Sequence, residues 1–177
     1  MSIIDTSYFV KDISIPVGSL SNLTNEIVKY EPEVLTMLLG YELYKLTLSE
    51  TSQRMTDLLT GKEYTVSYNG RDQLIKWNGF SNTQLISLIA YYTYYLWQRN
   101  NQTHTSKTGE NKPNQENSMI ASGGIKATAA WSRMRELYGY YGQIEIFPSC
   151  YNFLMEHESD YPELLFTEIG QINTFDL

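Results

Sequence analysis

Few side chains in this sequence have the types and spacing that metal binding requires. The two histidines, His104 and His157, lie far apart along the chain. Glu156, His157 and Glu158 are consecutive and carry ligating atoms, but neighbouring residues on a helix point in different directions. We therefore expect a solvated surface at this run, and neither a metal site nor a cofactor.

Catalytic signatures are also missing from the sequence. The runs at residues 122–124 and 108–109 contain glycine but lack the lysine and the spacing of a phosphate-binding loop. The pattern G-x-S-x-G does not occur. Cys150 is the single cysteine and is flanked by Phe147, Tyr151 and Phe153, so we expect a reduced, buried thiol and no nucleophile. The sequence predicts a protein that is not an enzyme.

The charge pattern argues against a general nucleic-acid binder. The formal net charge is -7, and from Glu136 onward the chain has eight carboxylates and no lysine or arginine. Basic residues between 107 and 135 alternate with glutamates, which weakens any contact with a phosphate backbone. The first residues lack a signal-peptide pattern. We expect a soluble intracellular protein with no membrane partner.

The elements that must position any functional surface are organised around residues 83–99, which we predict to be a buried central helix. Its apolar and aromatic residues cover most of its circumference, so other elements must surround it. The unbroken apolar run is shorter than the ~20 residues that span a membrane. Ser81 and Gln84 form a capping-box pattern that would start this helix.

Two further helices are expected before it. One starts at Ser21 or Asn22 and stops before Pro32; the next covers residues 32–48, with Pro32 in its first turn. The second helix has two apolar faces, one of them made of Leu35, Leu39, Leu43 and Leu46. Either it lies between two layers of its own domain, or one face contacts a neighbouring subunit.

A β-hairpin is predicted after a short amphipathic turn that ends at Gly61. Residues 62–68 and 71–77 flank Asn69 and Gly70, the pair preferred in a two-residue type I' turn. A lone hairpin is marginal in water, so it must pack on the helices or pair with another chain.

The remaining segments suggest a mainly α fold: a helical bundle around a buried central helix, with one β-hairpin insertion and extended arms at both termini. We expect an extended N-terminal arm at residues 1–20, a bundle domain at 21–160 with hairpin 62–77 and polar loop 100–118, and a C-terminal arm at 161–177. After Gly123 and Gly124, Trp131, Met134, Tyr138 and Tyr141 form a helical stripe. A final helix begins at Pro148, with Tyr151, Leu154 and Met155 facing inward.

Arms, a hairpin, a polar loop and a two-faced helix suit a subunit of an assembly. The residues expected to contact other subunits or partners are Leu35, Leu39, Leu43, Leu46, Asn69, Gly70, Lys107, Lys112, Tyr161, Phe166 and Phe175.

The order of these segments resembles a known family. The blocks KYEPEVLTMLLGYELYKL, YNGRDQLIKWNGF, SLIAYYTYYLWQRN, AAWSRMRELY and YPELLFTEIGQINTF, together with the polar loop, resemble head-tail connector proteins (adaptor or head-completion proteins) of tailed bacteriophages. The likeness is greatest to those of phages of Bacteroidetes, including crAss-like phages.

The resemblance implies a structural protein of the virion neck, made in the host cytoplasm. Its copies would form a ring, expected to be a dodecamer, beneath the portal protein. The ring would contact tail or neck proteins and line the channel through which double-stranded DNA passes without sequence-specific binding. The family has no catalytic residues to assign here, and the hairpin departs from its plainest all-helical members.

Two other interpretations stay open at this point. One is a tail-completion or tail-terminator ring protein of the same particle. The other is a monomeric helical regulator or small-ligand binder, in which the aromatic-rich central helix would line a pocket.

Overall fold

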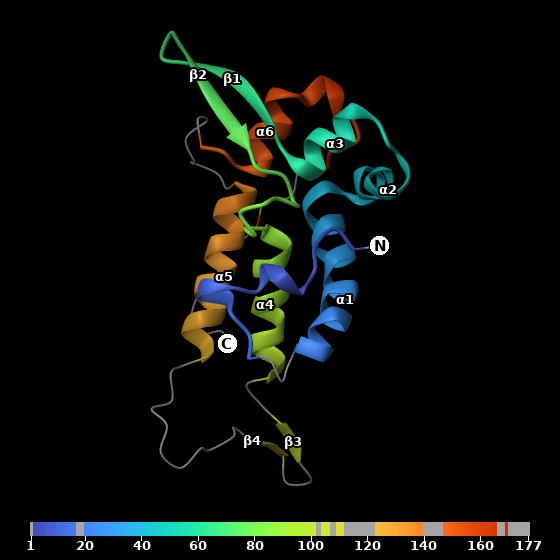
Figure 1. Ribbon diagram of the computed structural model, residues 1–177, viewed down its shortest axis with the longest axis vertical. Helices are drawn as coiled ribbons and strands as arrows, with labels where there is room; N and C mark the ends of the chain where they lie inside the picture. Colours follow the sequence, from blue (N-terminus) through green and yellow to red (C-terminus); the bar gives the residue numbers. More distant parts are fainter. Residues whose placement is uncertain are drawn as a thin grey trace.

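The computed structural model describes residues 2–16, 20–101, 104–106, 109–111, 123–139, 147–165 and 169, and these form a mainly α fold with an antiparallel hairpin (Figure 1). The helices are α1 (Leu20–Leu39), α2 (Tyr41–Ser49), α3 (Gln53–Thr60), α4 (Leu88–Asn101), α5 (Gly123–Tyr138) and α6 (Cys150–Glu156), with 3-10 turns η1 (Thr6–Tyr8), η2 (Lys11–Ile13) and η4 (Glu158–Asp160). The strands are β1 (Lys62–Tyr68), β2 (Arg71–Trp77), β3 (His104–Ser106) and β4 (Gly109–Asn111), in two separate two-stranded sheets.

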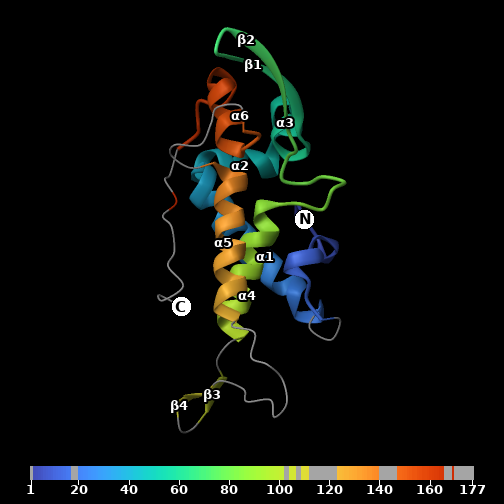
Figure 2. The same cartoon turned by 90° about the vertical axis from the view of Figure 1, so that its left-hand side faces the viewer.

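The long helices α1, α4 and α5 run side by side, and Figures 1 and 2 agree on this arrangement. Every residue of α4 from Leu88 to Tyr95 is buried, so α4 packs on several sides at once. The Oη of Tyr92 donates to Glu33 of α1 at 2.5 Å, and the ring of Tyr95 lies 4.9 Å from the ring of Trp131 of α5. These contacts connect α4 to both neighbouring helices.

The start of α4 differs from the prediction. The helix begins at Leu88, five residues later than expected, and Leu85 has a left-handed backbone with φ of 57°. The side chain of Asn82 bonds both the N–H and the C=O of Ile86, which holds the chain in a turn. Ser87 Oγ then accepts the N–H of Ile89 at 3.3 Å. Local side-chain hydrogen bonds therefore replace the first helical turn that the capping-box pattern indicated.

The predicted boundary at Pro32 is also wrong. Helix α1 continues through Pro32 and ends at Leu39, and Gly40, with φ of 79°, separates it from α2. Proline removes one hydrogen bond to the carbonyl four residues earlier, here that of Val28. Because Val28 is 59% exposed, solvent can reach this side of the helix. Gly40 supplies the sharp break, since a left-handed φ favours glycine.

The prediction of α3 and of the hairpin is confirmed. Helix α3 ends before Gly61, whose φ is 98°, and β1 pairs with β2 in a regular antiparallel register from Lys62↔Trp77 to Tyr68↔Arg71. Asn69 and Gly70 both have positive φ, 52° and 71°, as a type I' turn requires.

Residues 2–16 pack on the helices of their own chain. Two 3-10 turns replace the predicted extended conformation, and the side chains buried by this segment are those of Ile4, Tyr8, Phe9, Ile13 and Ile15. In Figure 2 the segment lies against α1. The N-terminal segment is therefore part of the hydrophobic core.

The last helices follow the predicted stripe with two corrections. In α5, Met134 and Tyr138 are fully buried, and Tyr141 lies outside the described residues. Helix α6 begins at Cys150, capped by Ser149 Oγ, which accepts the N–H of Asn152. Met155, expected to face inward, is 41% exposed, because α6 instead turns Cys150, Phe153 and Leu154 to the core.

Candidate interaction surfaces

The predicted surface of leucines proves to lie inside the fold. Leu35, Leu39 and Leu43 are completely buried, and Leu46 is partly buried against the same core. Of the two interpretations of this face, the burial favours the one in which it lies between layers of its own domain. Leu35, Leu39 and Leu43 offer no surface to a neighbouring subunit in this conformation, because packing inside the chain already covers them, and Leu46 is accessible only in part.

Tyr161 is also an internal contact. It is 2% exposed, and its Oη donates to the carbonyl oxygen of Arg54 at 2.6 Å. The guanidinium of Arg54 in turn donates to Glu50 at 2.7 Å, to Glu163 at 3.0 Å and to the carbonyl of Asp160 at 2.6 Å. Together these bonds tie the segment that follows α6 to α3.

The C-terminal arm contacts the body at two further points within the described residues. The N–H of Leu165 donates to the carbonyl of Leu39 at 3.2 Å, while the Leu165 side chain is 67% exposed. Arg135 Nε donates to the carbonyl of Ile169, which is buried. Four of the other predicted contact residues lie outside the described part of the chain, namely Lys107, Lys112, Phe166 and Phe175.

In the acidic run at the end of α6, Glu156 and Glu158 are exposed, as expected, and His157 packs on its neighbours. The His157 ring lies 4.6 Å from the ring of Phe153 and 5.4 Å from that of Tyr64, and its Nδ1 is 2.9 Å from the Phe153 carbonyl. Within the described residues no group of three or more His, Cys, Asp or Glu side chains could hold a metal ion. The geometry therefore gives His157 a structural contact with Tyr64 of the hairpin.

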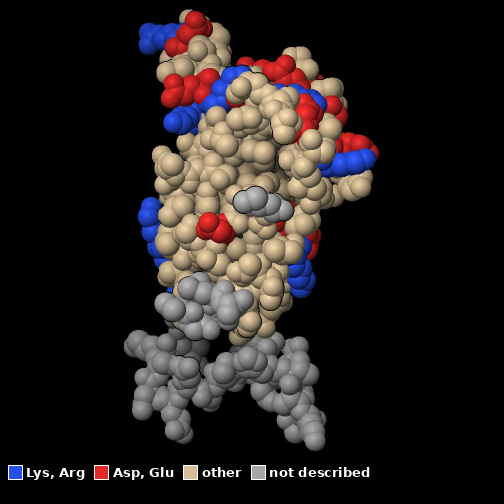
Figure 3. All heavy atoms as spheres, turned by 45° about the vertical axis from the view of Figure 1, so that its right-hand side comes forward, with Lys and Arg blue, Asp and Glu red and all other residues tan. Residues whose placement is uncertain are grey.

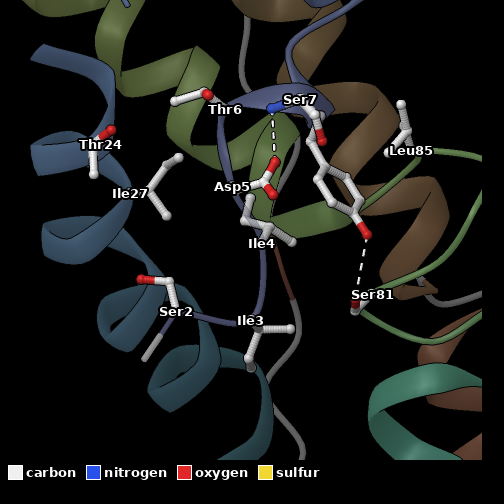
Figure 4. A pocket seen from close by; sticks show the side chains of 11 residues that line it. Ser2, Ile3, Ile4, Asp5, Thr6, Ser7, Thr24, Ile27, Ser81 and Leu85 are labelled. Atoms are coloured by element: carbon white, nitrogen blue, oxygen red, sulfur yellow. Dashed lines mark hydrogen bonds between the residues drawn. The ribbon is translucent and has the colours of Figure 1, made fainter. Parts of the chain in front are cut away.

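A cavity of about 650 Å³ lies between the N-terminal segment, α1 and the loop before α4 (Figure 4). Its lining residues are Ser2, Ile3, Ile4, Asp5, Thr6, Ser7, Tyr8, Thr24, Ile27, Ser81 and Leu85. Sequence analysis missed this cavity, because it requires the N-terminal segment to fold back on α1.

Two polar side chains of this cavity, those of Asp5 and Tyr8, hydrogen-bond to neighbouring backbone groups. The Asp5 carboxylate accepts the N–H of Ser7 at 2.8 Å, and hydrogen bonds with Ser7 lower the pKa of Asp5. Tyr8 Oη accepts the N–H of Asn82 at 2.8 Å and donates to its carbonyl at 3.0 Å. No residue of α4 is among the lining residues, so the aromatic central helix does not form this pocket. The arrangement provides hydroxyl groups and apolar walls, and no acid–base pair suited to catalysis.

The β1–β2 hairpin is the element that projects furthest from the helices at one end of the molecule (Figures 1 and 2). Its base is anchored: Trp77 Nε1 donates to the Leu58 carbonyl at 3.0 Å, and the Trp77 and Phe153 rings stack 6.1 Å apart. Tyr64 is 7% exposed, and burial raises its pKa to about 12, so its hydroxyl stays neutral. The predicted contact residues Asn69 and Gly70 form the free tip, and Asn69 is exposed.

Charged side chains are unevenly distributed over the face drawn in Figure 3. They gather at the hairpin end and along the sides, and the broad middle of this face is uncharged apart from one acidic side chain. This face therefore has no cluster of basic residues of the kind that binds a phosphate backbone.

Comparison with known proteins gives no family to which the chain can be assigned: no family model, no curated protein and no solved structure matches it. Among the described helices none is both long and apolar enough to cross a lipid bilayer.

Proposed function

We propose that this chain is a structural virion protein whose copies form a ring at the portal vertex, connecting the phage head to the tail and lining the DNA channel. The resemblance of its ordered sequence blocks to head-tail connector proteins carries the proposal. The fold supports it, since the blocks correspond to separate elements: α1 with α2, the hairpin turn with β2, α4, and α5.

In this proposal the body is a helical bundle organised around α4, and the contacts with other proteins are made by its projecting parts. The β1–β2 hairpin and the exposed side chain of Leu165 are available for such contacts. The leucine face is excluded from them, because it is buried. The partners are neighbouring copies, expected to be twelve in a ring, the portal protein above, and tail or neck proteins below.

The charge pattern fits a channel that DNA passes through. Affinity for DNA depends on how many phosphates are neutralised by Lys and Arg. The chain has 13 basic and 20 acidic residues, and the uncharged middle of the face in Figure 3 offers few phosphate contacts. DNA would slide past such a surface without being retained.

Immunogold electron microscopy of the virions that encode this chain tests the proposal. We expect label at the junction of head and tail, and antibody that has been pre-absorbed with the purified chain serves as the control. Label on purified tails that lack heads, with none on heads that lack tails, would replace the connector with the tail-terminator alternative. Particles without label would overturn the virion role.

The cavity beneath the N-terminal segment supports a second candidate, a small-ligand binder. A monomer whose melting temperature rises with a small polar ligand, and which is absent from virions, would favour it. Substituting Thr24→Leu, which fills the cavity wall, should abolish that rise, whereas Thr56→Leu on the exposed side of α3 should not.

A further inference from the structure

The β1–β2 hairpin is a two-stranded sheet with two outer edges. In a hairpin with a two-residue turn the residues flanking the turn, Tyr68 and Arg71, form a hydrogen-bonded pair, and such pairs alternate with non-hydrogen-bonded ones. The N–H and C=O groups of the alternate pairs point away from the partner strand. These outward-facing residues are Glu63, Thr65 and Ser67 on β1 and Asp72, Leu74 and Lys76 on β2.

Both edges are accessible in the described part of the chain. All six side chains at these positions are exposed, and their outward backbone groups have no hydrogen-bond partner among the described residues. The turn-proximal half of β2, from Arg71 to Leu74, is exposed on both faces of the sheet, whereas Val66 on β1 is 3% exposed. Leu74 is 72% exposed, more than any other large hydrophobic residue described. An open edge of this kind is a template for pairing with another strand.

We propose that a second copy of this chain completes the sheet, with the outer edge of β2 in one copy pairing antiparallel to the outer edge of β1 in the next. The direction of this pairing rests on the proposed ring. A head-to-tail contact joins two different surfaces, and repeated around an axis it closes into a ring. Each hairpin then has both of its edges paired.

Charge complementarity supports a second copy as the occupant. If the register inside the hairpin repeats between copies, Lys76 of one copy faces Glu63 of the next, and Leu74 faces Thr65. Inside the hairpin Lys76 Nζ already lies 3.9 Å from Glu63 Oε1, and both side chains are at least 60% exposed, so each can accept a second partner. Asp72 faces Ser67, so no like charges are opposed in this register.

A two-fold contact between the β2 strands of two copies is the competing geometry. It would place Leu74 against Leu74 and Lys76 against Asp72, which is also complementary. However, it closes after two copies and leaves the β1 edge of each copy unpaired. The head-to-tail contact pairs every edge and is therefore the arrangement we infer.

Cross-linking of single-cysteine variants tests the contact in the full chain. Thr65→Cys and Leu74→Cys are purified separately with different tags, mixed, and treated with a short bis-maleimide. This reagent is chosen because hydrogen-bonded pairs hold their Cβ atoms about 5.5 Å apart, further than the ~3.8 Å of a disulfide. Native Cys150 does not compete, since it is fully buried. Val28→Cys and Ile125→Cys, exposed on α1 and α5, are the matched control pair.

The proposal expects cross-links between the two different variants, above the yield of the control pair. Cross-links that join two copies of the Leu74→Cys variant would overturn the head-to-tail contact in favour of the two-fold one. Rings that form without either cross-link would overturn pairing through the hairpin and leave the proposed ring intact. A chain that stays monomeric up to millimolar concentration would also overturn the inference, while immunogold labelling of virions decides the proposed function independently.

A proline substitution gives a second readout that does not depend on cross-linking. Leu74→Pro removes an outward N–H without removing a bond inside the hairpin, and proline is tolerated at such edge positions. Leu74→Ser removes the side chain but keeps the N–H. We expect the midpoint concentration of self-association to be at least about tenfold higher for Leu74→Pro than for Leu74→Ser, since the proline variant loses both the N–H and the register. Equal midpoints for the two variants, with unchanged circular dichroism, would overturn backbone pairing at this edge.

Discussion

The carboxylate of Glu31 on α1 accepts the backbone N–H of Ile3 with both of its oxygens, at 3.0 Å from Oε1 and 2.9 Å from Oε2. A further bond from the N–H of Ile4 to Oε2 measures 3.4 Å. Glu31 is 5% exposed, and burial raises its pKa although these backbone hydrogen bonds oppose the rise. One buried side chain therefore satisfies two backbone groups where the N-terminal segment meets the helix.

Replacing this carboxylate should release the N-terminal segment. In Glu31→Ala the N–H groups of Ile3 and Ile4 lose their acceptor, and a buried group left unsatisfied costs about 1–3 kcal/mol. We expect a loss of that size in the free energy of unfolding by urea, and faster amide hydrogen exchange in residues 2–16. Glu42→Ala, at an exposed position of α2, should change neither quantity. Exchange that stays slow in residues 2–16 would show that apolar packing holds this segment without Glu31.

Gly40 and Gly70 form a matched pair for testing the break between α1 and α2. Both have positive φ, 79° and 71°, and the ψ of Gly40 is 159°, a combination found almost only in glycine, so alanine at Gly40 costs about 1–3 kcal/mol of backbone strain. At Gly40 an added Cβ would also lie 2.7 Å from the Cβ of Leu165, whereas at Gly70 nothing lies within 4 Å. Gly40→Ala should therefore be the more destabilising in chemical denaturation, and it should speed exchange of the Leu165 amide. Equal losses for the two variants would contradict both the clash with Leu165 and the greater backbone strain at Gly40.

Arg54 should make stability depend on pH in the acid range. Its hydrogen bonds lower the pKa of Glu50 from 4.5 to about 2, so the charged pair stabilises the folded state above pH 4.5 and this stabilisation is lost as the pH falls toward 2. The difference in melting temperature between the wild type and Arg54→Met should therefore be greatest near neutral pH and shrink on acidification. Arg133→Met removes an exposed pair with Glu136 and is the control, with a small effect at every pH. A difference that stays constant across the acid range would contradict the role of the Glu50 contact.

Cys150 should be unreactive in the folded protein. The thiol is completely buried, and burial raises its pKa far above the usual range, so almost no thiolate forms at neutral pH. We expect Ellman's reagent to label Cys150 in denaturant and to leave it unlabelled in buffer. Leu74→Cys, at an exposed position, should be labelled at once under both conditions. Rapid labelling of native Cys150 would indicate local opening of α6.

Features governed by local chemistry were predictable from the sequence. The hairpin followed from Asn69 and Gly70, because few residue pairs adopt two successive positive φ angles. The end of α3 followed from Gly61, because glycine is preferred where a helix ends in a residue of positive φ. The burial of Cys150 followed from its aromatic neighbours. In each case the residues that determine the structure are adjacent in the chain.

Features that depend on distant contacts were not predictable in this way. Pro32 stays inside α1 because the packing of α1 outweighs the loss of one hydrogen bond, and the side chain of Asn82 delays the start of α4. Leu35, Leu39 and Leu43 are as apolar as an interface would require, but the layers on both sides of them cover that face within one chain. The cavity near Tyr8 exists only because the N-terminal segment returns to Glu31 and Asn82, which lie 28 and 74 residues away from their partners.

The sequence by itself determined the mainly α composition, the hairpin and the buried thiol, since periodicity and turn residues act over a few positions. The tertiary structure decided which apolar faces are internal and which edges stay open. Which face is buried depends on the free energy of packing one element against another, and the residue pattern of a single segment does not reveal this free energy. The open edges of β1 and β2 are the clearest example, because their outward backbone groups have no hydrogen-bond partner among the described residues.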